Sequence, residues 1–155
     1  MQPANNLGYL LSHVASVMSK QADQILQKEL GLGLSQFKIL MVLQKNERVQ
    51  QRFIADSLGQ TEASISRQIQ LLQDKGLLTS KRDLKNLRQR ITVPTTDGLA
   101  LTKTAMTTIN KHLQPELAQM SQPAFDALMT NLHDLHEIVC QPGKTGACDH
   151  QFKAV

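Results

Sequence analysis

Aromatic side chains are scarce in this sequence, and tryptophan is absent. Phenylalanine, tyrosine and tryptophan together make up 3% of the 155 residues. Surfaces on which single-stranded bases stack are built from such rings. We therefore expect neither a base-stacking platform nor a comparable one for carbohydrates.

Cysteine and long apolar runs are scarce as well. Cys140 and Cys148 both lie near the end of the chain, which suits a reducing compartment better than a disulfide framework. The longest apolar run, residues 39–43, is too short to cross a bilayer, and residues 1–6 do not resemble a signal peptide. We expect a cytoplasmic protein without a membrane partner.

Motifs of catalysis and cofactor binding are missing too. The sequence contains no nucleophile elbow, no Walker loop and no glycine-rich dinucleotide turn. Its length corresponds to one structural domain with a real hydrophobic core. We expect a binding protein that is not an enzyme and needs no cofactor.

A short segment near the middle of the chain has the spacing of a helix-turn-helix. Ala55 is small where two helices cross closely, Gly59 can take the positive φ that ends a helix, and Ile65 buries the second helix. The second helix is expected over residues 61–75, with a threonine N-cap and a stop at Gly76.

The expected second helix has two different faces. Ile65, Ile69 and Leu72 recur at helical spacing and form a buried stripe. The opposite face is small, polar and cationic, which suits a DNA major groove because arginine and glutamine carry donors for bases and phosphates. An ordinary solvated helix shows the same pattern. The residues expected at DNA are Thr61, Ala63, Ser64, Ser66, Arg67 and Gln70.

A basic hairpin follows this helix and favours DNA binding over a solvated surface. Its arms, residues 77–83 and 87–93, are separated by a turn near residues 84–86. Five of the 17 basic and one of the 13 acidic residues lie in positions 81–90, so the hairpin holds the net charge of the chain, +4. Such a wing would contact phosphates or a minor groove. Its cationic residues are Lys81, Arg82, Lys85, Arg88 and Arg90.

The second arm of the hairpin alternates in character, as a half-buried strand does. The apolar face is expected to carry Leu87, Gln89, Ile91 and Val93. The face that carries Arg88, Arg90 and Thr92 is expected to be polar and exposed.

Further motifs on both sides of these elements follow a known pattern. They are Leu34-Ser35-Gln36-Phe37-Lys38-Ile39-Leu40, Ile54-Ala55 with Leu58, Ile65-Ser66-Arg67, Leu71-Leu72, Lys75-Gly76-Leu77-Leu78 and Thr95-Thr96-Asp97-Gly98. Together they resemble the MarR-type winged-helix transcription regulators. The chain departs from that pattern at the wing tip. Where the family usually has Asp-x-Arg, it has Asn86-Leu87-Arg88, so the usual carboxylate partner of the arginine is replaced by an amide.

The resemblance implies a mainly α fold with a small β wing, a winged helix-turn-helix with long N- and C-terminal dimerisation helices. Apolar spacing agrees with one helix over residues 5–30 that ends at Gly31, and with Leu99, Ala105, Ile109 and Leu113 on another that Pro115 kinks or breaks. A last helix is expected after a cap at Ser121.

The chain is accordingly divided into four parts of one structural domain. These are residues 1–32, the N-terminal dimerisation helix; residues 33–95, the winged helix-turn-helix lobe; residues 96–141, the C-terminal dimerisation helices; and residues 142–155, a flexible tail. The resemblance implies a homodimer that binds a pseudo-palindromic operator in duplex DNA, a repressor released by a small effector. The alternative from another class is a winged-helix module for protein assembly that does not read DNA.

Three kinds of effector are considered. His133, Glu137 and Cys140 are ligand types that zinc accepts, and some relatives sense zinc, but a solvated helix face explains them better and we expect no metal site. Redox sensing is a minor alternative. The resemblance implies that a peroxide-sensing cysteine would lie in the first helix, and residues 1–139 contain no cysteine. For an organic effector in the crevice between the dimer helices and the lobe, the candidate contacts are Tyr9, His13 and Arg82.

Overall fold

The computed structural model describes residues 3–46, 48–86 and 90–141. In chain order the described elements are α1 (Pro3–Leu30), α2 (Leu34–Lys45), β1 (Val49–Gln50), α3 (Gln51–Leu58), α4 (Glu62–Asp74), β2 (Leu78–Arg82), β3 (Arg90–Pro94), α5 (Thr96–Leu117) and α6 (Gln122–Val139). The predicted fold class, mainly α with a small β wing, is confirmed.

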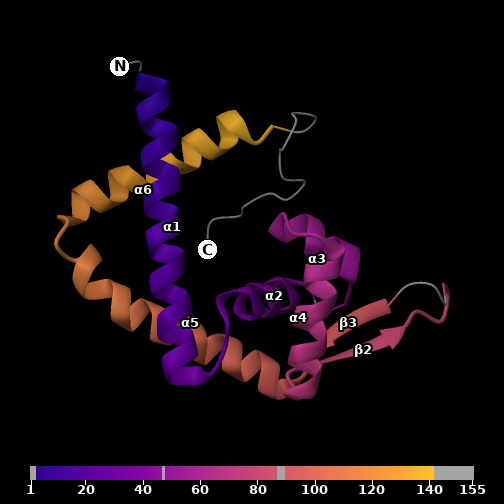
Figure 1. The fold of residues 1–155 in the computed structure, drawn as a ribbon. Coiled ribbons are helices and arrows are strands. Elements are labelled where there is room, and N and C mark those ends of the chain that lie inside the picture. Colours follow the sequence, from indigo (N-terminus) through magenta and orange to yellow (C-terminus); the bar gives the residue numbers. More distant parts are fainter. Residues whose placement is uncertain (1–2, 47, 87–89, 142–155) are drawn as a thin grey trace.

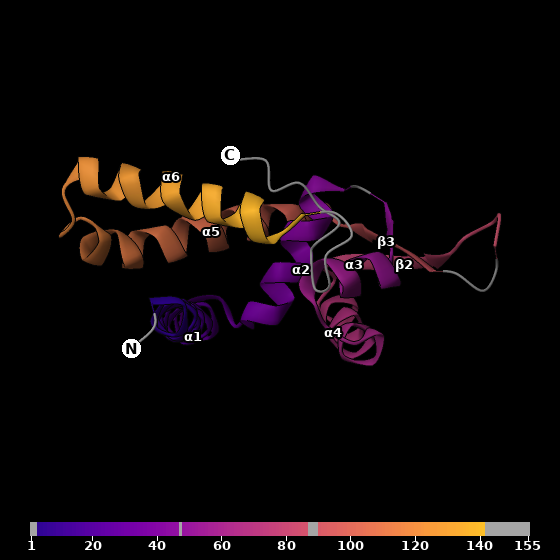
Figure 2. The same cartoon turned by 90° about the horizontal axis from the view of Figure 1, so that it is seen from above.

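A winged lobe and three long helices make up the molecule (Figure 1). The lobe consists of α2, α3, α4 and the sheet, and α5 runs from it to the far side of the molecule. From the turn there, α5 and α6 diverge like the arms of a V, and α1 lies against α5. Seen from above in Figure 2, α1 and the V occupy different levels. The wing projects away from the long helices.

The hydrophobic core lies within the lobe and at its junction with α1 and α5. Its fully buried members include Leu26, Leu32, Ile39, Leu40, Leu43, Ile54, Ile65, Leu72, Leu78 and Ala105. The junction of α1 with α2 is tight, because α1 ends at Gly31 with φ 59° and Asp23 Oδ1 accepts a hydrogen bond from the Leu34 N–H at 2.8 Å. The predicted end of the first helix at Gly31 is confirmed.

The sheet has three antiparallel strands in the order β1-β3-β2. The predicted hairpin corresponds to β2 and β3, with Arg82 opposite Arg90 and Ser80 opposite Thr92. The short strand β1 was not predicted; its Val49 pairs with Thr92 on the other side of β3. Consequently β3 is a central strand rather than the outer arm of a two-stranded wing.

The central position of β3 buries one residue that was expected to be exposed, although Arg90 on the same face is exposed as predicted. Thr92 was expected on an exposed polar face, but it is fully buried, with 0% of its surface exposed. Opposite residues in an antiparallel pair point to the same side, so Thr92 shares its face with Ser80, while Leu78 and Pro94, also opposite each other, lie on that face too. Helices α2 and α3 pack against β3. Ile91 is only half-buried.

Burial leaves the Thr92 hydroxyl without a hydrogen-bond partner among the described residues. An unsatisfied buried hydroxyl costs about 1 to 3 kcal/mol. Thr92→Val, which keeps the branched shape, is therefore expected to raise the free energy of unfolding by about 1 kcal/mol in urea denaturation.

The matched control for this substitution is Thr102→Val. Thr102 is equally buried, but its hydroxyl donates to the Gly98 carbonyl oxygen at 2.7 Å. Its loss is expected to lower the free energy of unfolding by about 1 kcal/mol. Equal effects of the two substitutions would contradict the assignment of Thr92 as the unsatisfied group.

The buried residues of α5 are Gly98, Thr102 and Ala105, whereas Leu99 is 40% exposed. The helix differs from the prediction near its end, because it continues through Pro115 to Leu117. A proline without an N–H removes only one hydrogen bond when it lies in the last turn, so the helix does not break there. The cap at Ser121 is confirmed, since its side chain accepts from the Ala124 N–H.

Candidate nucleic-acid interface

Helix α4 is fixed at its start by two polar contacts. The Thr61 side chain accepts a hydrogen bond from the Ser64 N–H at 3.2 Å, as the predicted N-cap requires. Gln51 Nε2 at the start of α3 donates to the Glu62 carbonyl oxygen at 2.9 Å. At the other end, Gly76 has φ 70°. The helix therefore has the predicted limits and is held against α3.

The two faces of α4 are arranged as predicted. Ile65, Ile69 and Leu72 are buried in the core. The residues expected at DNA are all exposed: Thr61, Ala63, Ser64, Ser66, Arg67 and Gln70. Gln70 is partly engaged, because its Nε2 donates to Asp74 Oδ1 at 2.9 Å. Among the described residues, no carboxylate forms an ion pair with Arg67.

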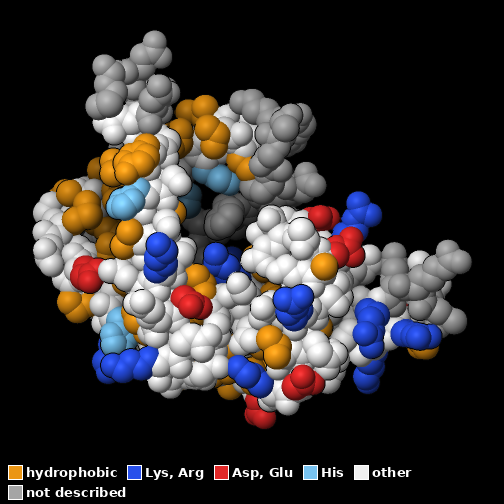
Figure 3. Space-filling model, in the orientation of Figure 1, with side chains coloured by type: hydrophobic (Ala, Val, Ile, Leu, Met, Phe, Trp, Pro, Cys, Tyr) orange, Lys and Arg blue, Asp and Glu red, His pale blue; other side chains and the backbone are white. Residues whose placement is uncertain are grey.

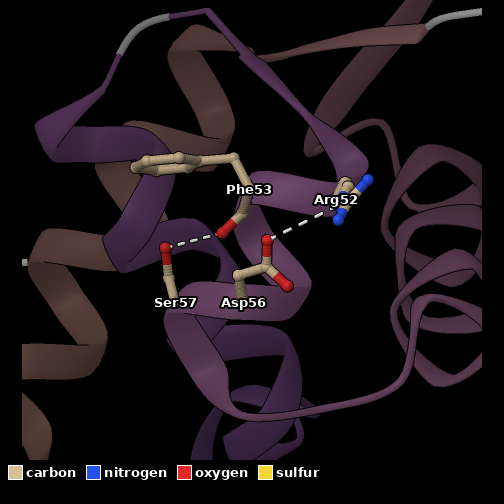
Figure 4. Close-up of polar contacts among 4 residues, drawn as sticks. All are labelled: Arg52, Phe53, Asp56 and Ser57. Carbon is tan, nitrogen blue, oxygen red and sulfur yellow. Dashed lines mark hydrogen bonds and ion pairs between the residues drawn. The ribbon is translucent and has the colours of Figure 1, made fainter. Parts of the chain in front are cut away.

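A charged residue on α3 extends this surface, and the sequence reasoning did not identify it. Arg52 Nε lies 3.8 Å from Asp56 Oδ2, one turn away on the exposed side of the helix (Figure 4). On the same helix Ser57 Oγ donates to the Phe53 carbonyl oxygen at 2.7 Å. The first helix of a helix-turn-helix crosses the phosphate backbone, so Arg52 is a further candidate for a phosphate contact. The spacing of four residues on one helix explains its pairing with Asp56.

The end of α4 is tied to the turn between α1 and α2. Lys75 Nζ donates to the Gly31 carbonyl oxygen at 2.7 Å and to Gln36 Oε1 at 3.3 Å. Gln36 is itself buried and accepts from the Gly33 N–H. A shift of α1 against the lobe would therefore also displace the end of α4.

The wing carries its cations toward the end that is remote from the core. Lys81, Arg82, Lys85 and Arg90 are exposed, and Figure 3 shows a group of blue side chains over the wing. Arg82 and Arg90 are opposite each other on one face, whereas Lys81 pairs with Ile91 on the other. The predicted contact residue Arg88, with its neighbours Leu87 and Gln89, lies outside the described residues.

A helix with a small, polar exposed face beside a cationic strand pair is the geometry of a winged helix-turn-helix. The sequence profile described as "MarR family" matches residues 30–89, the segment that contains α2 to β2 and the wing turn. Over residues 30–89 the chain is therefore similar to the MarR family. A search of curated protein sequences gives no match.

Solved structures of MarR-family proteins have the same fold at low sequence identity. Wild-type MarR from E. coli in its apo form has a TM-score of 0.78 at 19% identity, over 87% of this chain and 97% of that one. The S. aureus MepR–DNA complex has a TM-score of 0.69 at 23% identity, over 83% and 94%. CouR from Rhodococcus jostii RHA1, bound to p-coumaroyl-CoA, has a TM-score of 0.74 at 19% identity, over 89% and 94%.

The candidate effector residues are not brought together within one chain. Tyr9 and His13 stack on α1 with ring centroids 6.0 Å apart, and Tyr9 is largely exposed. Arg82 lies at the end of β2, on the wing. An effector pocket would therefore have to include a second protomer, or be formed by the α1 rings or by Arg82 alone.

No metal site is formed by the described part of the chain. Among those residues, no group of three histidine, cysteine, aspartate or glutamate side chains is placed to hold a metal ion. His133 and Cys140 are half-buried on α6, and Glu137 is exposed. Cys148 and His150 lie outside the described residues. None of the described helices is long and apolar enough to cross a membrane.

Apolar side chains on α1 and α6 remain exposed. On the N-terminal half of α1 they are Leu7, Leu10, Leu11, Val14, Val17 and Met18, and on α6 they are Leu128, Met129, Leu132, Ile138 and Val139. No residue of α6 is buried within the described part of the chain. Figure 3 shows hydrophobic side chains gathered over this side of the molecule, away from the cationic wing.

Proposed function

We propose that this protein is a MarR-family regulator, a homodimeric, sequence-specific repressor that occupies a pseudo-palindromic operator in duplex DNA. The observation that carries the proposal is the exposed face of α4 beside the cationic wing. Small side chains on α4 permit close approach to the floor of the major groove. Ala63, Ser64, Ser66, Arg67 and Gln70 would contact bases and nearby phosphates, and Thr61 would lie at the groove edge.

The wing contributes affinity rather than base recognition in this proposal. Lys81, Arg82, Lys85 and Arg90, with Arg88, would neutralise phosphates or enter the adjacent minor groove. Releasing counterions from that many phosphates gives binding that weakens steeply with salt. In this proposal base contacts on α4 determine specificity, and phosphate contacts on the wing contribute affinity.

Dimer formation is supported by the exposed apolar faces of α1 and α6. Large apolar patches on a soluble protein mark interaction surfaces. A two-fold dimer would bury these faces and present two copies of α4 to half-sites about one helical turn apart, roughly 10 bp.

Release from DNA by a small organic effector completes the proposal. The link from Lys75 to Gly31 and Gln36 supports it, because a ligand that shifts α1 against the lobe also shifts α4. CouR, one of the similar structures, is bound to p-coumaroyl-CoA. Tyr9, His13 and Arg82 remain the candidate contacts. A zinc-responsive or redox-responsive regulator of the same fold is less favoured, as is an assembly module that does not read DNA.

Selection of bound sequences from random duplexes tests the function directly. We expect a pseudo-palindrome with half-sites roughly 10 bp apart, bound by two protomers. Recovery of no consensus at physiological salt would contradict sequence-specific binding and favour the assembly module. Repeating the binding assay with added zinc or with peroxide separates the alternative effectors.

The dimer surface is tested by Leu10→Glu, which places a charge in the exposed apolar stripe of α1. Leu10 is 54% exposed in the single chain, so folding of the protomer should not suffer. We expect a shift toward monomer in sedimentation analysis and a loss of operator affinity of at least tenfold.

The matched control is Ser12→Glu, on the same helix. Two residues along an α-helix correspond to a turn of about 200°, which puts Ser12 on the opposite, polar side of α1. It should leave the association state and affinity unchanged. A dimer that survives Leu10→Glu would show that α1 is not part of the interface.

A further inference from the structure

One leucine on the wing has no role in the fold. Leu84 is 94% exposed, which makes it the most exposed large hydrophobic side chain in the described part of the chain. It lies in the turn that follows β2. A polar residue would serve a solvent-exposed turn equally well, so folding does not explain leucine here.

The backbone around Leu84 is held in a defined turn. Asp83 Oδ1 accepts a hydrogen bond from the Lys85 N–H at 3.0 Å, and the Asp83 carbonyl oxygen accepts one from the Asn86 N–H at 3.2 Å. An aspartate that bonds the backbone two residues on is a recognised turn-forming device. The turn thus presents the leucine at the tip instead of folding it back on the wing.

The charges around Leu84 indicate what kind of surface it meets. Lys85 is its immediate neighbour, and Lys81, Arg82 and Arg90 lie on the strands behind it. An apolar pocket on another protein would have to be rimmed with acids to accept this tip. The minor groove of DNA offers both features at once, since phosphates line its edges and apolar sugar and base surfaces form its walls.

We propose that Leu84 is an apolar wedge that the wing inserts into the minor groove beside the half-site, where it partly unstacks one base step. This inference rests on the proposed function, because it assigns a specificity-determining contact within the same DNA complex. Pyrimidine–purine steps such as TA and CA/TG unstack most readily, while A-tracts are stiff. The wedge therefore favours a flexible step under the wing tip, although no base edge there is hydrogen-bonded.

The test compares the wild-type protein with two variants on the selected operator, with 2-aminopurine placed at each step under the wing. Wild-type protein should raise 2-aminopurine fluorescence at one step, and should bind duplexes with TA there about tenfold more tightly than duplexes with an A-tract. Leu84→Ser should lose both effects with an unchanged salt slope. Leu84→Met, which keeps an apolar side chain, should retain them.

Lys85→Ser is the matched control in the same turn. It should lower affinity for all duplexes alike and reduce the salt slope by about one unit, while the 2-aminopurine signal persists. The inference is overturned if Leu84→Ser binds and unstacks DNA as the wild-type protein does, or if it changes only the salt slope. In either case wild-type binding to a palindrome still supports the proposed function. Absence of any duplex binding by the wild-type protein would instead reject the proposed function itself.

Discussion

Gly98→Ala is expected to destabilise the whole winged lobe. A Cβ atom at Gly98 would lie 1.9 Å from the Leu77 carbonyl oxygen, a backbone atom that cannot rotate away. The same carbonyl accepts a hydrogen bond from the Thr95 N–H at 3.1 Å, and the Thr95 hydroxyl donates to the Gly76 carbonyl oxygen at 2.8 Å. The substitution therefore forces α5 away from the start of β2 and breaks the junction that orients the wing.

The expected size is a loss of about 3 kcal/mol in the free energy of unfolding, at the upper end of the range for overpacking. That is a large share of the stability of a typical domain. Urea denaturation at a fixed protomer concentration measures it, because association would otherwise contribute.

Gly8→Ala is the control for this prediction. Gly8 lies within helix α1 and an added Cβ meets nothing within 4 Å. Alanine is favoured over glycine inside a helix by up to about 1 kcal/mol, so this variant should be as stable as the wild type or more so. Similar losses in both variants would contradict the steric explanation for Gly98.

The parts of the fold that the sequence predicted well depend on local signals. The start and end of α4 follow from Thr61 as a cap and from Gly76, whose positive φ is needed where the helix stops. The buried stripe of Ile65, Ile69 and Leu72 follows from helical spacing alone. Each of these signals lies within a few residues of the structure that it specifies.

The errors arose where a distant segment decides the outcome. Burial of Thr92 depends on Val49, which adds a strand on the far side of β3 and is too short a signal to recognise in the sequence. The position of the start of α5 depends on the close approach of Gly98 to Leu77, which no local pattern indicates. The link from Lys75 to Gly31 likewise joins residues 44 positions apart.

The sequence predicts which residues form the candidate site, but it does not predict which of their side chains are engaged by neighbouring residues. The exposed face of α4 was correctly predicted. Only the structure shows that Gln70 is engaged by Asp74, while Arg67 forms no ion pair with any described carboxylate. Among the α4 residues, Arg67 therefore has the most donors available for DNA. It is the residue on which specificity is expected to depend most.

Arg67→Ala is expected to lower operator affinity by about 1 to 3 kcal/mol and to relax the preference at one base position. The cause is the loss of a fork of donors suited to a guanine edge in the major groove. Arg90→Ala, on the wing, removes the same charge but should weaken binding to all duplexes alike, with the salt slope reduced by about one unit. Binding constants for a set of single-base operator variants, measured at several salt concentrations, separate the two effects. If Arg67→Ala gave only the uniform, salt-dependent loss expected for Arg90→Ala, then α4 would contact phosphates at this position and the base recognition assigned to Arg67 would be wrong.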